Sequence, residues 1–431
     1  MKVLKSSSIT PFGGLNFVLE ELDNLGIDQI LQHDLPKLPT QSKYNWKDLL
    51  YSFWSIFFCG GDCTEDLSIH LKETFTGNPY IKVPSPDRVL ERMKELSCPL
   101  QVFDTPRGSK RHEFGINDRL SDLNIRILKK LSLIHKHNNI LDYDNTIIFT
   151  EKADATMTYK RDTGYCPGVG IIGNNIVYLE NRNGHSDAQT LQQDTLKRMF
   201  DTLKTQGVNI GVFRADSASY QLSTLSVISG KVDKLYIRGR MSESMHEAIC
   251  QINHWNKIIF DDKIVYRGEV EFTPFEKIAK RTKQQHLLKK YRLIVTKERR
   301  NDGQSNLFTG EAFNYSTIIT NDFEMTPDQI VFFYNQRGAI EREFDIMKND
   351  FGWYNMPFSK MQYNTVFLIL TAICRNIYHY VICSFSKVYK HLSPTFRIKK
   401  FIFRFICIPA KWVKTSRMKN LRIYGNLHFK T

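Results

Sequence analysis

The sequence predicts an α/β fold: a mixed sheet flanked by helices, interrupted by a β-rich insertion and preceded by a helical N-terminal domain. Three observations predict it. Residues up to about 100 carry apolar side chains at helical spacing, residues from 140 alternate between strand-like and helix-like runs, and residues 250–320 are rich in short β-like runs. Strands followed by alternating helices and strands are typical of a sheet covered by helices.

The composition limits the class of protein. The 431 residues include 60 Lys and Arg against 45 Asp and Glu, a net charge of +15, and 42% of them are apolar. That much apolar surface supports a large core and excludes a disordered chain. A protein with this net positive charge attracts polyanions such as DNA, RNA or an anionic membrane. One close cysteine pair, Cys59 and Cys63, lacks the further ligands of a zinc site, so we expect reduced thiols in a cytoplasmic protein.

Two apolar stretches have the composition of membrane spans. Residues 49–59 are too few to cross a bilayer. Residues 366–383 are interrupted by Arg375, Asn376 and His379, which would be costly in lipid. We therefore expect both stretches to be buried core helices and expect no membrane partner.

The first hundred residues predict helices at 15–25, 46–58 and 87–96. Ser85 and Pro86 occupy the N-cap and first helical positions of the third helix. Its basic residues Arg88, Arg92 and Lys94 suit a DNA groove. A packing helix with a solvated basic face explains them equally well.

The elements after residue 139 follow in a regular order. Strands are expected at 140–149, 169–172, 175–179, 211–215 and 234–237, and helices at 187–205 and 220–228. No Gly-x-Gly-x-x-Gly or Walker loop stands at these turns, so no nucleotide cofactor is expected. After the insertion, Thr326 and Gln329 form a capping box that begins a helix running to about Phe351, with Gly352 placed to end it.

These patterns divide the chain into six segments. They are a helical DNA-binding domain (1–100), a linker and helical lead-in (101–139, with 101–117 as the best linker candidate), the first part of the core (140–249), the β-rich insertion (250–320, with a basic stretch at 277–290), the second part of the core (321–390) and a basic tail (391–431). In the tail, Lys and Arg residues alternate with aromatic residues, so a folded hairpin is also expected there.

Two aspartates stand where core strands end. Asp144 lies in the first strand, and Asp216 directly follows strand 211–215. Open α/β sheets collect reactive groups outside their strand ends, and Mg²⁺ prefers carboxylates together with substrate phosphate. A turn role explains either aspartate alone. Asp142, two residues before Asp144, points to the same face and is an alternative first ligand.

A third acid lies on the helix that follows residue 326. At about 100° per residue, Tyr334, Arg337, Glu341 and Lys348 fall within an arc of about 60°. The adjoining arc is apolar and predicts that the helix docks on the sheet through Phe333, Ile340, Phe344 and Met347.

Helical geometry separates Glu341 from its neighbours only in part. Glu343 projects nearly opposite Glu341, so we expect it to face solvent. Asp345 lies one turn from Glu341 and remains a rival as the third acid. A surface salt bridge between Arg337 and Glu341 is the purely structural explanation.

The spacing Tyr334-x2-Arg337-x3-Glu341-x6-Lys348 resembles the Y-R-E-K signature of bacterial insertion-sequence transposases, which have an RNase H-like catalytic core. Two further segments, 144–146 and 214–217, are similar to those around the family's first and second aspartates. The motifs at 13–15, 60–66 and 84–86 are similar to the N-terminal pattern of one subgroup. The resemblance therefore covers most of the chain.

The resemblance implies an RNase H-like fold and a catalytic triad that binds Mg²⁺ or Mn²⁺: Asp144, Asp216 and Glu341. It also implies three residues that contact DNA near the cut end: Tyr334, Arg337 and Lys348. Relatives that cut through a DNA hairpin hold a flipped base with a tryptophan of the insertion, and Trp255 is the candidate here. A core tryptophan in the insertion explains Trp255 more simply.

We therefore expect a DDE-type DNA transposase, an endonuclease and strand transferase that binds the terminal inverted repeats of an insertion sequence. It would cleave the element's ends and join them to target DNA by two-metal phosphoryl transfer. Expected partners are end and target duplex DNA and a second copy of the chain, in the bacterial cytoplasm on the nucleoid. The alternatives are an inactive, transposase-derived DNA-binding regulator and an RNase H-like nuclease or resolvase without strand transfer. The three acids disfavour the first, and the insertion with the Y-R-E-K helix disfavours the second.

Overall fold

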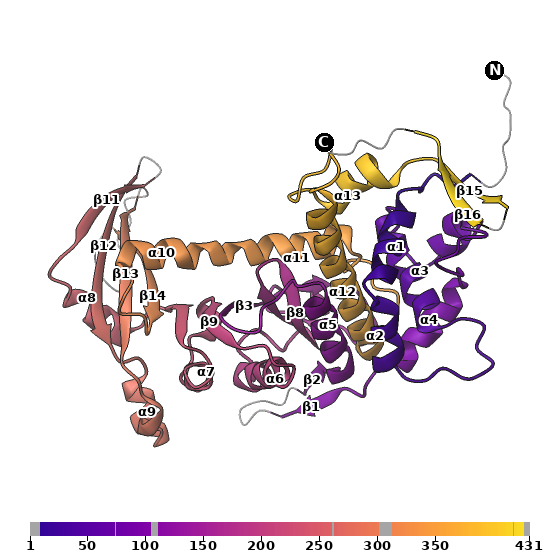
Figure 1. Ribbon diagram of the computed structural model, residues 1–431. Coiled ribbons are helices and arrows are strands. Elements are labelled where there is room, and N and C mark those ends of the chain that lie inside the picture. Colours follow the sequence, from indigo (N-terminus) through magenta and orange to yellow (C-terminus); the bar gives the residue numbers. More distant parts are fainter. Residues whose placement is uncertain are drawn as a thin grey trace.

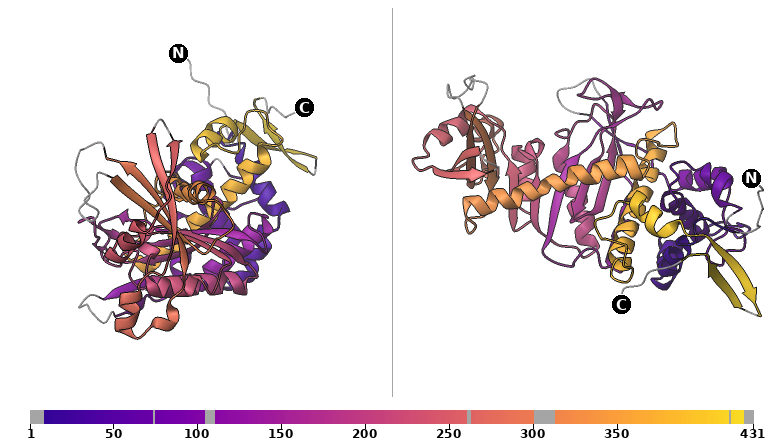
Figure 2. Two further views of the ribbon diagram at one scale, coloured as in Figure 1. Left: turned by 90° about the vertical axis from the view of Figure 1, so that its left-hand side faces the viewer. Right: turned by 90° about the horizontal axis from the view of Figure 1, so that it is seen from above.

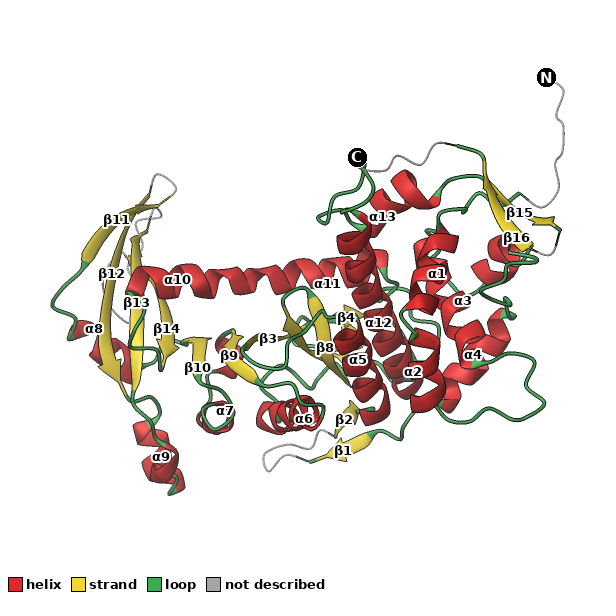
Figure 3. Cartoon of the chain, viewed as in Figure 1, coloured by secondary structure: helices red, strands yellow, loops and turns green. Residues whose placement is uncertain are grey.

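The computed structural model describes residues 9–73, 75–104, 111–260, 263–300, 313–416 and 418–425. Residues 105–110 of the linker candidate at 101–117 lie outside the described residues. Figure 1 shows an elongated molecule, with the strands of the insertion at one end, the core sheet in the middle and the N-terminal helices at the other end. Figure 3 shows mainly strands in the first part, strands together with helices in the second and mainly helices in the third.

An 11-stranded sheet runs through the described core and insertion. Its strands follow the order β1 (Gln101–Phe103), β2 (His112–Gly115), β8 (Asn175–Arg182), β7 (Gly168–Ile172), β3 (Asn139–Asn145), β9 (Ile210–Ala215), β10 (Lys234–Arg238), β14 (Phe313–Thr320), β13 (Tyr291–Arg299), β12 (Lys263–Phe272) and β11 (Asn256–Phe260).

The central five strands have the RNase H-like arrangement. Across the sheet these strands lie in the order β8, β7, β3, β9, β10. Numbered by their order along the chain, this is 3-2-1-4-5. β3 and β9 are parallel, as are β9 and β10, whereas β7 is antiparallel to both β3 and β8. The fold class predicted from the sequence is confirmed.

The strands of the insertion extend the core sheet instead of forming a sheet of their own. β14 pairs antiparallel with β10, with Ile319 opposite Ile237, and β13, β12 and β11 follow outward. The basic stretch 277–290 lies on α9 (Glu276–Thr282) and the turn after it. At the opposite edge, the described part of 101–139, where we expected a linker and a helical lead-in, adds β1 and β2 before α5 (Asp118–Lys130). Pairing with β8 satisfies polar groups that an open edge would expose.

Helices cover both faces of the core sheet. α6 (Gln192–Thr205), α7 (Leu222–Ile228) and α8 (Glu243–Cys250) pack on the face formed by Leu141, Tyr143 and Phe213. α12 (Met361–Phe385) packs on the other face, where Val169 and Ile171 lie. Side chains alternate along a strand, so Asp142 and Asp144 belong to the α12 side and not to the α6 side.

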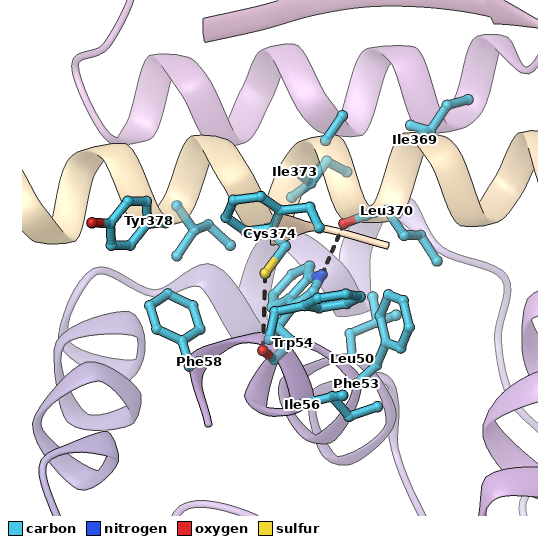
Figure 4. Packing of buried hydrophobic residues seen from close by; sticks show 14 of the residues in the cluster. Leu50, Phe53, Trp54, Ile56, Phe58, Ile369, Leu370, Ile373, Cys374 and Tyr378 are labelled. Atoms are coloured by element: carbon cyan, nitrogen blue, oxygen red, sulfur yellow. Dashed lines mark hydrogen bonds between the residues drawn. The ribbon is translucent and has the colours of Figure 1, made fainter. Parts of the chain in front are cut away.

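The N-terminal helices share one hydrophobic core with α12. They are α1 (Leu15–Asn24), α2 (Ile27–Asp34), α3 (Trp46–Phe58) and α4 (Pro86–Glu95), and α1, α3 and α4 match the three predicted helices. The indole Nε1 of Trp54 donates to the Leu370 carbonyl at 3.1 Å, and the Cys374 thiol donates to the Trp54 carbonyl at 3.9 Å (Figure 4).

Among the described residues, α12 is the one helix long and apolar enough to span a membrane, and 83% of its most apolar window is buried inside the protein. Two of its polar side chains pair within the protein: Arg375 donates to Glu343 at 2.8 Å, and Asn376 donates to Asn124 at 2.9 Å. The expectation that residues 366–383 are a buried core helix is confirmed.

The basic tail folds back onto the N-terminal region. After α13 (Ile398–Phe401), β15 (Ala410–Thr415) and β16 (Met418–Ile423) form an antiparallel hairpin, as predicted. Gly13 and Gly14 donate their N–H groups to the carbonyls of Ile408 and Ile406. A Cβ on either glycine would collide with tail backbone, which explains why this motif consists of glycines.

Candidate active site

The predicted Glu-bearing helix consists of three consecutive parts: α10 (Pro327–Asn335), a 3-10 turn (Gln336–Gly338) and α11 (Ala339–Asp350). Figure 2 shows them as one long, nearly straight element crossing the sheet. Thr326 and Gln329 form the predicted capping box. The helix ends as predicted at Phe351, before Gly352 with φ of 75°.

The two aspartates lie side by side at the strand ends. Tyr143 and Ala215 are the last pair between β3 and β9, and Asp144 and Asp216 follow them directly. Burial and then the charge of Asp216 disfavour the carboxylate form of Asp144 and raise its pKa to about 6, although Arg337 acts in the opposite direction. This crowding of two acids is what a cation would relieve.

Asp142 is already engaged by another residue. Its two carboxylate oxygens accept hydrogen bonds from Nε and Nη2 of Arg214, both at 2.7 Å. Arg214 also donates to the Phe333 carbonyl at 2.7 Å and lies against the Phe333 ring. Asp142 therefore belongs to a bidentate pair that docks α10 on the sheet, whereas Asp144 is not held in a bidentate pair of this kind. Arg214 stood in the sequence motif, but only the structure gives it this partner.

Tyr334 and Arg337 connect the helix to the aspartates. The Tyr334 hydroxyl donates to the carbonyl of Ala215, the residue before Asp216, at 3.2 Å. Arg337 Nη1 donates to Asp144 Oδ2 at 3.1 Å, and its Nη2 lies 3.9 Å from Glu341 Oε1. The arginine thus contacts both Asp144 and Glu341.

Glu341 is the exposed member of the three acids, with 74% of its side chain accessible. Within the described ranges, one group of possible metal ligands has all its ligand atoms within 4.8 Å of one another, namely Asp62, Cys63 and Asp66. The three candidate acids do not yet converge to that distance. Since Glu341 is on an exposed surface beside Arg337, rotation of its side chain meets no packing obstacle of the kind that buried side chains have.

Two further acids of α11, Asp345 and Glu343, are held elsewhere. Asp345 accepts from Arg397 Nη1 and from the Asn349 amide, each at 2.6 Å. Glu343 does not face solvent: our prediction was wrong, because its carboxylate is buried and pairs with Arg375 of α12 at 2.8 Å. α11 lies between solvent, the sheet and α12, so its apolar arc is not its only buried side.

Lys348 lies two turns beyond Glu341, half-buried, with its ammonium 6.0 Å from the centre of the Tyr354 ring. Burial and then the positive charge of Lys160 lower the pKa of Lys348. Lys160 belongs to a small sheet of β4 (Ile148–Phe149), β5 (Thr156–Met157) and β6 (Thr163–Tyr165), which we had not predicted. Its strands of two or three residues are too short for periodicity to indicate them.

Trp255 packs within the insertion. Its indole donates to the Ile252 carbonyl at 3.2 Å, and the Lys297 ammonium lies 4.0 Å above its ring. The ring is half-buried beneath Gly268. These contacts agree with the simpler packing role, and a role in holding a flipped base stays a prediction.

The basic residues of α4 have partners in the chain. Arg88 pairs with Glu91 at 3.0 Å and Arg92 with Glu95 at 2.6 Å. The Lys94 ammonium lies 5.8 Å from the ring centres of two aromatic residues of the core segment. This arrangement favours a packing role for α4 over insertion into a DNA groove.

Comparisons with known proteins show the family of the chain. The family model for the transposase DDE domain, group 1, matches residues 110–430. Among solved structures, the chain is similar to that described as the piggyBac transposase synaptic complex with hairpin DNA, at 11% identity and a TM-score of 0.42, over 91% of this chain and 78% of that one. No curated protein matches the sequence. Because the family model covers more than half of the chain, the protein belongs to the transposase DDE domain family, group 1.

Proposed function

We propose that the chain is the cut-and-paste transposase of a bacterial insertion sequence, which binds the element's terminal inverted repeats, cleaves its ends and joins them to target DNA. The observation that carries the proposal is the placement of Asp144 and Asp216 side by side at two parallel strand ends, beneath the helix that bears Glu341. Membership of the DDE family supports DNA transposition as the reaction class.

The proposed metal ligands are Asp144, Asp216 and Glu341, for Mg²⁺ or Mn²⁺. Their oxygen donors suit hard divalent cations. The pKa of Asp144 is raised partly by the negative charge of Asp216, and a cation bound between the two carboxylates would offset that repulsion. Such ions supply the nucleophile and neutralise charge during in-line phosphoryl displacement. Asp142 is disfavoured because Arg214 binds both of its carboxylate oxygens, and Asp345 because it is paired with Arg397 at 2.6 Å, closer than Arg337 lies to Asp144.

The protein's own cations would position the DNA. Arg337, which holds Asp144 in the DNA-free chain, and Lys348 would contact phosphates beside the cut, while Tyr334 fixes the helix on the strand that leads to Asp216. Hydrolysis of one strand leaves a 3′-hydroxyl that then attacks target DNA. Both steps are phosphoryl displacements, so one site performs both, and its contribution is positioning and charge neutralisation.

Assembly follows from the need to hold two ends. We propose that two copies of the chain form the synaptic complex on DNA, with contacts from the N-terminal helices and the basic segments at 277–290 and 391–431. Each of these segments adds positive charge that would track the phosphate backbone.

A strand-joining assay tests the proposal. A labelled duplex carrying the end of the encoding element would be incubated with the protein, Mg²⁺ and an unlabelled plasmid. The expected result is label covalently attached to plasmid. Cleavage without joining would support the nuclease or resolvase alternative, and binding without cleavage in Mg²⁺ and in Mn²⁺ would support the inactive regulator.

A further inference from the structure

A small cavity lies between α11 and α12, and the proposed reaction does not use it. Its volume is about 150 Å³. Side chains of these two helices line it together with the loop at 394–397 and with Asn174, from the turn between β7 and β8. At about 30 Å³ for each water molecule, the cavity has room for roughly five waters. It therefore suits a small ion and is too small for a nucleotide.

Positively charged side chains predominate in the lining of this cavity. Arg342, Arg375 and Arg397 line it together with one acid, Glu343. Arg375 is 5% exposed and donates to Glu343 at 2.8 Å, but its Nε and Nη1 have no hydrogen-bond partner among the described residues. Arg397 pairs with two aspartates of α11, whereas Arg342 is exposed and has no ion-pair partner within the ranges that the structure describes. Guanidinium groups with unused donors favour an anion beside them.

His379 provides the cavity with a hydrogen-bond acceptor. Its ring lines the cavity, and its Nδ1 lies 2.7 Å from Oδ1 of Asn175. The amide nitrogen of Asn175 donates to the carbonyls of Leu133 and Ile172, so Oδ1 accepts and Nδ1 carries the proton. Burial and then the charge of Arg375 lower the pKa of His379 to about 4, so the ring is neutral near pH 7. The other ring nitrogen, Nε2, is therefore an unprotonated acceptor.

We propose that this cavity binds a protonated phosphate group, whose anionic oxygens are attracted by Arg342 and Arg375 and whose P–OH donates to Nε2 of His379. Sulfate and the internal phosphodiesters of DNA carry no such proton near neutral pH, so they would leave Nε2 without a donor. Two sources supply the group: free orthophosphate, and the terminal phosphate of a DNA strand, a monoester whose second pKa is about 6. Glu341 lies outside the lining, so this site is separate from the proposed metal site and does not depend on the proposed function.

Equilibrium dialysis of the full chain with radiolabelled orthophosphate tests the site. EDTA is present and the pH is 6.0, at which His379 stays neutral and both sources keep a P–OH in a large share of molecules. The expected result is saturable binding, which sulfate displaces only at roughly tenfold or higher concentration than unlabelled orthophosphate does, because the sulfate complex lacks one hydrogen bond. Absence of saturable binding, or displacement by both ions at equal concentrations, would overturn the inference.

Two variants and a matched control locate the binding. Arg342→Gln should weaken orthophosphate binding roughly tenfold or more, since it removes a charged hydrogen-bond donor. Arg404→Gln removes an exposed arginine that does not line the cavity and should bind as the wild type does. His379→Phe should bind orthophosphate and sulfate with equal affinity. Because Arg342 is on the surface, its variant decides the question even where His379→Phe does not fold, and unchanged affinity in Arg342→Gln contradicts the inference.

Competition with DNA distinguishes the two sources. The competitors are one short duplex with 5′-phosphates and the same duplex with 5′-hydroxyls. Displacement of labelled orthophosphate by the phosphorylated duplex alone identifies a DNA end as the source, and displacement by neither duplex identifies free orthophosphate. Equal displacement by both duplexes overturns the inference, because internal phosphodiesters have no P–OH. None of these measurements requires cleavage, so their outcome is independent of the strand-joining assay.

Discussion

At the scale of single residues, the strand ends decide which acids are free to react. Asp142 and Asp144 are equivalent in sequence spacing, and periodicity placed both on one face. The structure separates them because Arg214 binds both carboxylate oxygens of Asp142, while Asp144 accepts one longer hydrogen bond from Arg337 and is repelled by Asp216. Arg214 and Asp142 are 72 positions apart, so local spacing does not predict that they pair. Local spacing did predict that the aspartates lie near strand ends.

Asp144→Asn should stabilise the metal-free protein at neutral pH. The folded state raises the pKa of Asp144 from 3.8 to about 6, so the folded protein binds this proton more tightly than the unfolded chain. Stability is therefore lost as pH rises from about 4 to 6, and the asparagine avoids that loss. The gain at pH 7.5 should reach up to about 3 kcal/mol, because one pKa unit corresponds to about 1.4 kcal/mol.

Urea denaturation in EDTA at pH 7.5 and at pH 4 measures this effect. The two proteins should differ at the higher pH and converge at the lower one, where Asp144 of the folded wild-type protein is protonated and therefore as uncharged as the asparagine. Asp201→Asn, on exposed α6, is the control and should show no such dependence. An Asp144→Asn variant that is less stable than the wild type at pH 7.5 would mean that the Arg337 contact outweighs burial and repulsion.

At the scale of elements, local signals located the helices well and their surroundings less well. Three helix ends could be predicted because each depends only on residues close in sequence. They are the capping box at Thr326, the helix end before Gly352 and the helix start at Pro86. Glu343 was misplaced because a helical wheel assumes one buried side, and α11 also packs against α12. The small sheet was missed because its strands contain too few residues to show a period.

Arg375→Met should destabilise the protein by about 3–5 kcal/mol, since it leaves the buried carboxylate of Glu343 without its partner. Glu343→Gln combined with Arg375→Met should recover part of the loss, because the uncompensated charge is gone. Urea midpoints of the two variants and the wild type measure both effects. A loss below about 1 kcal/mol in the single variant, typical of surface pairs, would contradict the buried ion pair.

At the scale of the whole molecule, the N-terminal helices and the second half of the core form one hydrophobic cluster, so the boundary expected near residue 100 does not separate two cores. The sequence predicted the N-terminal helices but not that they pack against α12. Contacts such as that between Trp54 and Leu370 join residues 316 positions apart, which local patterns do not indicate. Likewise, β-like runs indicated the insertion, but its continuation of the core sheet through β10 and β14 depends on long-range pairing.

Trp54→Ala should cost about 3–5 kcal/mol, the usual loss for a large aromatic side chain removed from a core. Because α3 and α12 share that core, unfolding of the N-terminal helices and of the sheet should remain a single transition. Circular dichroism and the fluorescence of Trp353, in a chain whose other tryptophans are replaced by phenylalanine, should give one midpoint. Two separated midpoints would show that the N-terminal helices fold independently.

The central claim is that Glu341 completes a metal site with Asp144 and Asp216, and cleavage of a labelled end duplex by two single variants tests it most directly. With Mg²⁺, Glu341→Gln should bind the duplex as the wild type does and cut it more than about a hundredfold more slowly, since even residues that only support metal ligands cost up to that factor. Asp345→Asn, one turn away and paired with Arg397, should cut at nearly the wild-type rate. Cleavage that survives in Glu341→Gln and is lost in Asp345→Asn would contradict the account.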